Sequence, residues 1–184
     1  MIVSNKKKFI FVSIPKTGTT SIEKVLSKYE DAFPFVHYKK HAPFIEVDYL
    51  PLSYYKFCFF RNSWDQFVSM YQYHNDNNHN YLGIDYNVSF EDYIKVAILS
   101  PEYGFKTQYE YIVGTSDVFV YKFEEMDWAW EEICKKLNIS DKLPHLNKGT
   151  HPHYSTYYTE KTRDIVAKMC AREIKMMGYT FDNI

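Results

Sequence analysis

The sequence predicts an α/β fold with a parallel sheet flanked by helices in three layers. Short apolar runs at residues 8–14, 56–60 and 118–121 have the length and the aromatic or β-branched content of buried strands. Each run is followed by a stretch in which apolar residues recur at helical spacing, and strands that alternate with helices form parallel sheets. No internal repeat or linker interrupts the pattern, so residues 1–184 are expected to form a single domain.

The first strand leads into the most informative segment of the chain, a loop with the sequence PKTGTT. The residues of this loop are Pro15, Lys16, Thr17, Gly18, Thr19 and Thr20. A helix is expected from about Thr19 to Lys28. A buried strand, a sharp glycine-containing turn and a helix start together form a cradle of backbone N–H groups for an anion. Lys16 adds a positive charge, so the loop is expected to bind a phosphate-like group.

The order of residues in the loop differs from that of nucleoside triphosphatases. Their pattern, G-x-x-x-x-G-K-[ST], places a lysine after the second glycine and a magnesium-binding hydroxyl next to it. Here Lys16 precedes Gly18, the only glycine of the loop. The sequence therefore indicates an anion that is bound without a metal ion.

The remaining elements continue the alternation of strands and helices. They are a strand at 56–60, a helix from about Ser63, a helix at 89–99, a strand at 118–121, a helix at about 126–137 and a helix at 159–177 that ends at Gly178. The spacing Ser63-x-x-Gln66 predicts a capping box, and Ser89 is expected to cap its helix with Asp92 in the matching position.

Composition narrows the classes of partner. A net charge of −1 provides no basic field, so nucleic acid is not expected to bind. No apolar run approaches the length needed to cross a bilayer, and the N-terminus lacks the features of a signal peptide. Three widely separated cysteines fit a reducing compartment. We expect a cytoplasmic protein without an integral membrane segment.

A second cation follows the second strand. Arg61 stands where a magnesium-dependent nucleotide enzyme commonly has an aspartate, and its planar guanidinium suits phosphate oxygens. Ser69 lies two turns further along the next helix and could add a hydroxyl. The alternative is that Arg61 only pairs with Asp65 while Ser69 packs as a small residue. Lys16 and Arg61 both follow the carboxyl ends of strands, where parallel sheets bind ligands.

Taken together, these segments resemble the sulfotransferases that use 3′-phosphoadenosine 5′-phosphosulfate (PAPS). The ordered motifs strand–PKTGTT–helix and strand–RNxWDxxxSxY–helix carry the resemblance. The segments LPHLNK at 143–148, HY at 153–154 and GYTF at 178–181 extend it almost end to end. It is closer to the carbohydrate sulfotransferases, Golgi-type and bacterial, than to the cytosolic small-molecule branch. The resemblance implies a P-loop NTPase-like sulfotransferase fold.

The resemblance also implies roles for individual residues. Lys16 would contact the 5′-phosphosulfate and stabilise charge on the leaving nucleotide, and loop residues 15–20 would hold the 5′-phosphate. Arg61 and Ser69 would hold the 3′-phosphate. Lys148 and Gly149 are expected to close over the same nucleotide, which leaves as adenosine 3′,5′-bisphosphate (PAP).

The chain departs from the family at two positions. The family commonly has proline where Ser63 stands and arginine where Gln66 stands. Serine at an N-cap and proline at a helix start serve the same purpose, so the first change is expected to be compensated. Loss of a second cation at Gln66 is expected to weaken nucleotide binding.

An acceptor hydroxyl loses a proton during transfer, so a general base is useful. We predict His41, since residues 39–42 (KKHA) resemble the Lys-His-Ala stretch before the 3′-phosphate motif of related enzymes, and a neutral imidazole is a base near pH 7. A structural histidine is the alternative, and weaker candidates for the base are Glu46, Asp48 and Glu124. A metal site at His145, His151 and His153 is disfavoured because no matching cysteine or carboxylate pattern accompanies them.

The predicted function is transfer of a sulfuryl group from PAPS to a hydroxyl of a carbohydrate or glycoconjugate. One alternative is a small nucleotide-dependent kinase, which would need a magnesium site and a lysine after the loop glycine. Another is a nucleotide-binding module without turnover, which would keep Lys16 and Arg61 but would need no base.

Overall fold

The computed structural model describes residues 1–31, 40–46, 51, 53–76, 88–99, 105–144, 146 and 151–181. Contacts between these residues divide the chain into two compact units. Unit 1 comprises Met1–Phe60 and Glu110–Lys148, and unit 2 comprises Arg61–Tyr109 and Gly149–Ile184. A single domain over the whole chain stays a prediction.

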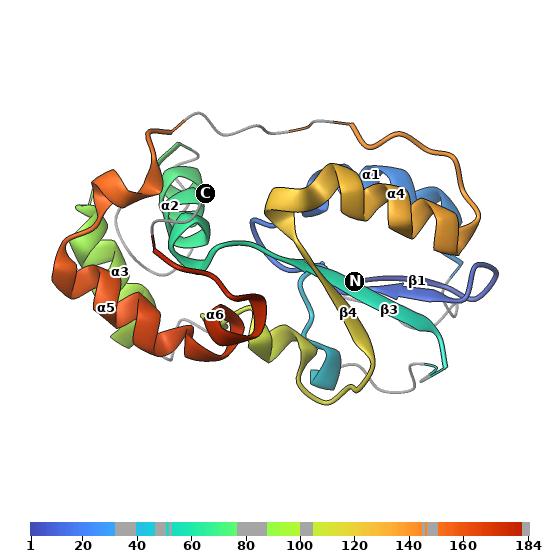
Figure 1. The fold of residues 1–184 in the computed structure, drawn as a ribbon, viewed down its shortest axis with the longest axis horizontal. Coiled ribbons are helices and arrows are strands. Elements are labelled where there is room, and N and C mark those ends of the chain that lie inside the picture. Colours follow the sequence, from blue (N-terminus) through green and yellow to red (C-terminus); the bar gives the residue numbers. More distant parts are fainter. Residues whose placement is uncertain are drawn as a thin grey trace. The chain divides into compact units, whose positions relative to one another are not determined.

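Unit 1 contains a four-stranded sheet with the strand order β1-β2-β3-β4 (Figure 1). The strands are β1 (Ile2–Ser4), β2 (Phe9–Phe11), β3 (Tyr55–Phe60) and β4 (Val118–Lys122). β2, β3 and β4 run parallel, which confirms the parallel arrangement predicted for these three strands. β1 pairs antiparallel with β2, with Ile2 opposite Phe11. This edge strand was not predicted, because three residues before a lysine-rich turn show no clear alternation.

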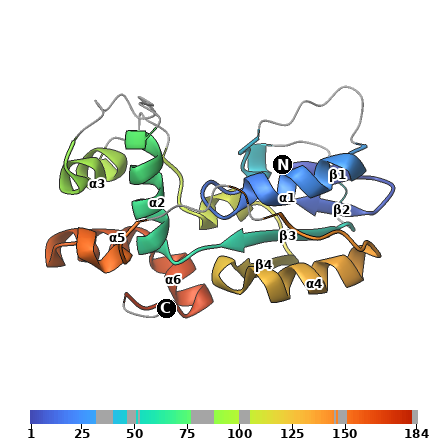
Figure 2. The ribbon, with the colours of Figure 1, turned by 90° about the horizontal axis from the view of Figure 1, so that it is seen from above.

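Two helices, α1 (Thr19–Leu26) and α4 (Met126–Leu137), pack on one face of this sheet. Figure 2 shows α1 beside β1 and β2, and α4 beside β4. Alternate strand residues point to the same face, so the inward side chains of the strands meet the apolar stripes of both helices. The central members of this core are Phe9, Phe11, Phe57, Phe59, Tyr121, Ile22, Leu26, Trp130 and Ile133.

Residues on the opposite face of the sheet are buried as well. Ile10, Cys58 and Phe60 have no exposed surface. Short 3₁₀ helices on that side contribute the buried residues Phe44 and Ile112 (Figure 1). A parallel sheet needs both faces covered, and this covering confirms the α/β class. The short helices within the described ranges are η1 (Ser27–Tyr29), η2 (Phe44–Glu46), η4 (Tyr109–Ile112), η5 (Phe123–Glu125) and η6 (Tyr154–Tyr157).

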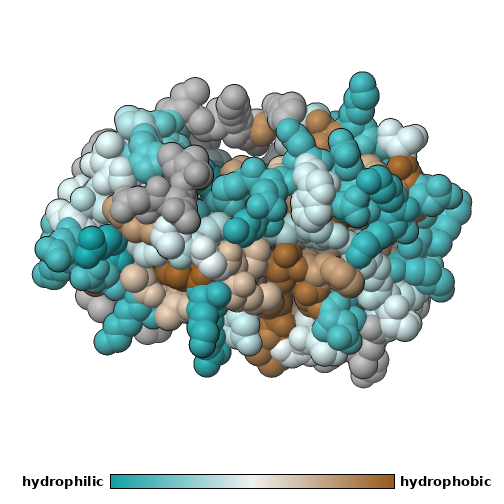
Figure 3. Space-filling model, in the orientation of Figure 1, coloured by the Kyte–Doolittle hydropathy of each residue, from teal (hydrophilic) through white to brown (hydrophobic). Residues whose placement is uncertain are grey.

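Hydrophobic residues gather over β4, the edge strand of the sheet (Figure 3). Phe119 is 49% exposed, and Trp128 of the adjacent α4 is 57% exposed. The ammonium of Lys136 lies 3.7 Å from the centre of the Phe119 ring. A lysine over an exposed edge strand disfavours pairing with another chain.

Unit 2 is helical in its described part. Its helices are α2 (Ser63–Asp76), α3 (Phe90–Leu99), α5 (Glu160–Met169) and α6 (Ala171–Met177). The N-cap predicted for α3 is confirmed, because the amide of Asp92 donates to Ser89 Oγ at 3.1 Å and that hydroxyl donates to the Asp92 carboxylate at 2.7 Å.

The prediction of one helix over 159–177 is wrong, since the chain breaks at Cys170 (φ −95°, ψ 23°). The break keeps its backbone hydrogen bonds, because the Cys170 amide donates to the Val166 carbonyl and the Cys170 carbonyl accepts from Ile174. Glu173, three residues after the break, is buried. A helical apolar stripe carries no signal for such a turn. The predicted end at Gly178 is confirmed, with φ 65°.

Candidate functional site

The loop between β2 and α1 has an unusual backbone. Lys16 and Gly18, on either side of Thr17, have φ values of 64° and 74°. Alternation between left-handed and ordinary conformations curls successive N–H groups toward one point, which is how proteins form anion-binding nests. A Cβ on Gly18 would lie 2.9 Å from Met126 Cε and 3.2 Å from Phe123 Cε2. Glycine is therefore favoured at position 18 by its positive φ, and a Cβ there would displace the end of the Met126 side chain and press on the Phe123 ring.

Hydrogen bonds hold the loop against the start of α1. The buried Thr17 hydroxyl donates to the Ile14 carbonyl at 3.0 Å, so its proton is used inside the loop. The Gly18 carbonyl accepts from the amides of Ser21 and Ile22. The amides of residues 19 and 20 belong to the first turn, where a helix provides no acceptor and the helix dipole is positive. This geometry suits an anion.

His41 lies beside the strand that carries this loop, in the same unit. Its Nδ1 is 2.9 Å from the carbonyl oxygen of Ser13. Since a carbonyl only accepts, Nδ1 carries the proton, and a neutral ring keeps its lone pair on Nε2. Burial lowers the pKa of His41, against an opposing effect of the hydrogen bond to Ser13. The ring is therefore neutral at pH 7 and can accept a proton.

Further polar contacts surround this histidine. The Ser13 hydroxyl donates to Glu23 Oε1 at 2.5 Å, and Lys40 Nζ lies 3.1 Å from Glu23 Oε2. Glu23 thereby links the strand before the loop to the segment that carries His41. Among the weaker candidates for the base, Glu46 and Glu124 are exposed on η2 and η5, and Asp48 lies outside the described residues.

The Arg61 segment belongs to unit 2. Arg61 Nε donates to Asp65 Oδ2 at 2.7 Å, and both side chains are largely buried. His151 Nε2 lies 3.7 Å from the other oxygen of Asp65. The pairing of Arg61 with Asp65 that the sequence left open is therefore present. It also fixes the plane of the guanidinium. Ser69 is partly exposed one turn beyond Asp65 on α2, on the same side of the helix.

The start of α2 differs from the sequence prediction. Asn62, and not Ser63, is the N-cap, since Asn62 Oδ1 accepts from the amides of Trp64 at 3.1 Å and Asp65 at 3.4 Å. The helix begins at Ser63, so the residue before it takes the capping position. The buried Ser63 hydroxyl has no hydrogen-bond partner within the described part of the chain. The predicted capping box of Ser63 and Gln66 is wrong.

Sequence reasoning missed Gln108, a fully buried residue of unit 2. Its side-chain amide makes two hydrogen bonds to the backbone of Arg61, at 2.7 and 2.8 Å. A glutamine in an irregular stretch carries no signal of that kind in a single sequence.

Lys148, Gly149 and His145 lie outside the described residues. The segment before Lys148 contacts α1, where the Leu146 amide donates to Ser21 Oγ at 3.1 Å.

Two solved structures share this arrangement of elements. Mouse sulfotransferase SULT7A1 complexed with PAP matches with a TM-score of 0.62 and 14% identity, over 95% of this chain and 87% of that chain. A sulfotransferase from Alicyclobacillus acidocaldarius matches with a TM-score of 0.50 and 15% identity, over 95% of this chain and 96% of that chain. The chain has the sulfotransferase fold. No family model and no curated protein sequence matches it.

The sulfotransferase fold confirms the fold that the sequence resemblance implied. Within that fold the loop 15–20 opens the first helix after a central strand, as expected. The roles of Lys16, His41, Arg61 and Ser69 stay predictions.

No group of three or more metal-ligating side chains that could hold a metal ion occurs among the described residues. None of their helices is long and apolar enough to cross a membrane.

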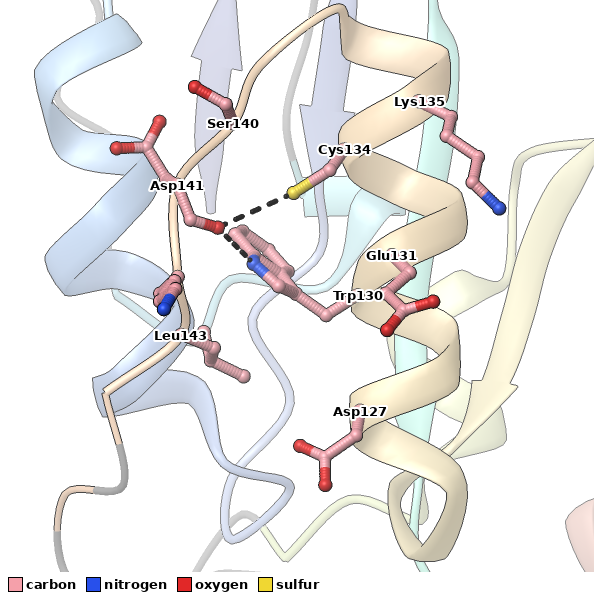
Figure 4. A pocket seen from close by; sticks show the side chains of 9 residues that line it. Asp127, Trp130, Glu131, Cys134, Lys135, Ser140, Asp141 and Leu143 are labelled. Atoms are coloured by element: carbon pink, nitrogen blue, oxygen red, sulfur yellow. Dashed lines mark hydrogen bonds between the residues drawn. The ribbon is translucent and has the colours of Figure 1, made fainter.

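A separate open pocket of about 500 Å³ lies between α4 and residues 140–143 (Figure 4). Trp130 Nε1 and Cys134 Sγ both donate to the Asp141 carbonyl, at 2.8 and 3.6 Å. Asp127, Glu131 and Asp141 line the pocket, and none of the predicted site residues does. Lys28 and Tyr29 lower the pKa of Asp141, so its carboxyl is charged at neutral pH. Lys135 and Lys142 also line the pocket, so its lining carries charges of both signs.

Proposed function

We propose that this protein is a sulfotransferase that transfers the sulfuryl group of PAPS to a hydroxyl of a carbohydrate or glycoconjugate. The observation that supports the proposal is the backbone of residues 16–20, where Lys16 and Gly18 have positive φ just before α1 begins, in a chain with the sulfotransferase fold. One of the two matched sulfotransferases is complexed with PAP, the nucleotide that PAPS leaves behind.

The loop would act on the 5′ side of the donor. In sulfuryl transfer an SO₃ group passes in line between two oxygens, and negative charge builds up on the leaving 5′-phosphate. The amides of Thr19 and Thr20 and the positive end of α1 face such a charge without reorganisation. Lys16 would add its ammonium to the same oxygens. Positioning and electrostatic stabilisation then provide most of the rate, as in phosphoryl transfer.

His41 would accept the proton of the attacking hydroxyl at Nε2. The hydrogen bond between Nδ1 and the Ser13 carbonyl holds the ring in the tautomer that leaves Nε2 unprotonated. Because burial lowers its pKa, His41 is available as a base at neutral pH. The acceptor oxygen then forms its bond to sulfur while the bond from sulfur to the 5′-phosphate oxygen breaks.

The 3′-phosphate would be bound by Arg61 and Ser69. Asp65 holds the guanidinium through Nε, and this contact orients the fork before the ligand arrives. Lys148 and Gly149 are proposed to close over the nucleotide, as the family resemblance implies. Selection of PAPS over ordinary adenine nucleotides then depends on the 3′-phosphate.

Thermal unfolding with added nucleotide tests the donor. PAP should raise the melting temperature more than ATP with magnesium does at the same concentration, because the tighter-binding ligand stabilises the folded state more. Preferential stabilisation by ATP with magnesium would point to the kinase alternative and overturn the proposal.

A screen of hydroxyl compounds with labelled PAPS tests the acceptor. Labelled sulfate should appear on glycans and not on simple phenols. Labelling of phenols alone would contradict the carbohydrate acceptor but would leave the donor unchanged.

A further inference from the structure

Arg61 stands at a point where regular backbone hydrogen bonding stops. β3 ends at Phe60, and the N-cap of α2 is Asn62. A backbone N–H and C=O in such a position need partners from elsewhere in the chain when they are buried. Where these partners come from decides how firmly the backbone of Arg61 is held.

Gln108 provides both partners. Its Oε1 accepts from the Arg61 amide at 2.7 Å, and its Nε2 donates to the Arg61 carbonyl at 2.8 Å. The primary amide of glutamine offers the same donor and acceptor as a peptide group, so it takes the place of one more residue of a strand. Only one orientation of this amide satisfies both contacts.

Gln108 is itself fixed. Its side chain has no exposed surface, and its backbone amide donates to Glu173 Oε1 of α6 at 3.2 Å. Glu173 is 1% exposed. A buried glutamine that is tied to a buried carboxylate has little freedom to follow movements of Arg61. The contacts therefore restrict the backbone of Arg61, while Asp65 restricts its guanidinium.

We infer that Gln108 is the positioning residue for Arg61 and thereby determines selectivity for a 3′-phosphate. The inference rests on the proposed function, in which Arg61 binds that phosphate. Gln108 acts through the backbone of Arg61 and needs no contact with the nucleotide. Its removal should therefore weaken recognition of the 3′-phosphate and leave the rest of nucleotide binding unchanged.

Calorimetric titration of PAP and of adenosine 5′-phosphate into the full chain separates binding of the 3′-phosphate from binding of the rest of the nucleotide. Gln108→Met keeps the length of the side chain and removes both hydrogen bonds. The Kd for PAP should rise about tenfold, and the Kd for adenosine 5′-phosphate should not change. Gln72→Met is the matched control, because Gln72 lies in the same unit and donates to the Tyr157 hydroxyl at 2.7 Å, away from Arg61. It should change neither Kd.

A double-mutant cycle with Arg61→Ala shows whether Gln108 acts through Arg61. Adding Gln108→Met to Arg61→Ala should cause no further loss of PAP affinity. Additive losses, or an equal rise of both Kd values in Gln108→Met, would overturn the inference and indicate a general structural role. If Gln108→Met does not fold, Gln108→Asn gives the same comparison, since it keeps the uncharged primary amide at this buried position but is one methylene too short to keep both contacts to Arg61.

Failure of the inference and failure of the proposed function give different results. If Arg61→Ala abolishes the preference for PAP while Gln108→Met binds like the wild type, only the inference is wrong. If the wild-type protein binds PAP and adenosine 5′-phosphate equally, the proposed role of Arg61 fails, and the inference fails with it.

Discussion

The Nδ1 atom of His41 lies 2.9 Å from the carbonyl oxygen of Ser13, three residues before Lys16 in the chain. Ser13 belongs to the segment that joins β2 to the loop of residues 15–20. The hydrogen bond therefore ties the predicted base to the same stretch of backbone that carries the predicted electrostatic catalyst. It also determines which nitrogen of the ring is free to accept a proton.

Replacement of His41 tests its role as a base. His41→Ala should lower kcat by roughly 10²- to 10⁴-fold, because the acceptor hydroxyl loses its proton acceptor. The base is active when neutral, so wild-type activity should fall as the pH drops through the pKa of His41, which burial places below its usual value. The variant should lose this acidic limb of the pH–rate profile.

His153→Ala is the control for this experiment, since His153 is exposed on the other unit. It should leave both the rate and its pH dependence unchanged. An unaltered acidic limb in His41→Ala would exclude His41 as the base.

Lys16 should matter more for turnover than for binding. Lys16→Ala removes an ammonium group whose attraction to the leaving nucleotide grows as negative charge builds up there. The value of kcat should therefore fall by about 10²- to 10³-fold. The Kd for PAP, measured by titration, should change far less. Lys24→Ala, at an exposed position of α1 in the same unit, should be close to wild type. A parallel loss of PAP affinity and turnover in Lys16→Ala would argue against a role specific to the transition state.

Gly18 should be required for the stability of the loop. Gly18→Ala places a methyl group at positive φ, 2.9 Å from the movable end of the Met126 side chain and 3.2 Å from the Phe123 ring, so the free energy of unfolding should fall by about 2 kcal/mol. Gly178→Ala is the matched control, because that residue also has positive φ but no atom within 4 Å of the added Cβ. It should lose only about 1 kcal/mol. Equal losses in chemical denaturation would show that the contact with Met126 does not matter.

The N-cap of α2 can be tested with two neighbouring substitutions. Asn62→Ala should lower the free energy of unfolding by about 1–2 kcal/mol, because it removes the acceptor for the amides of Trp64 and Asp65. Ser63→Ala should be neutral, since the buried Ser63 hydroxyl has no hydrogen-bond partner within the described part of the chain. Denaturant titration that finds the larger loss at Ser63 would restore the capping box expected from the sequence.

Local patterns were sufficient to predict the parallel strands, the helices that follow them and the loop of residues 15–20. Strands and amphipathic helices depend largely on the spacing of apolar residues that are close together in the chain. That spacing can be read from one sequence. The apolar strand, the glycine-containing turn and the helix start likewise predicted an anion cradle at residues 15–20, and the position of Lys16 before Gly18 predicted an anion bound without a metal ion.

Other features were decided only by contacts between distant residues. β1 forms because it can pair with β2. The helix predicted for residues 159–177 breaks at Cys170, in a segment where Glu173 is buried. Asn62 caps α2, and its side-chain amide also donates to the Thr180 carbonyl. The two hydrogen bonds from Gln108 to Arg61 join residues 47 positions apart. Such contacts depend on where the folded chain brings polar groups together away from water, and a local pattern of residues contains no information about that.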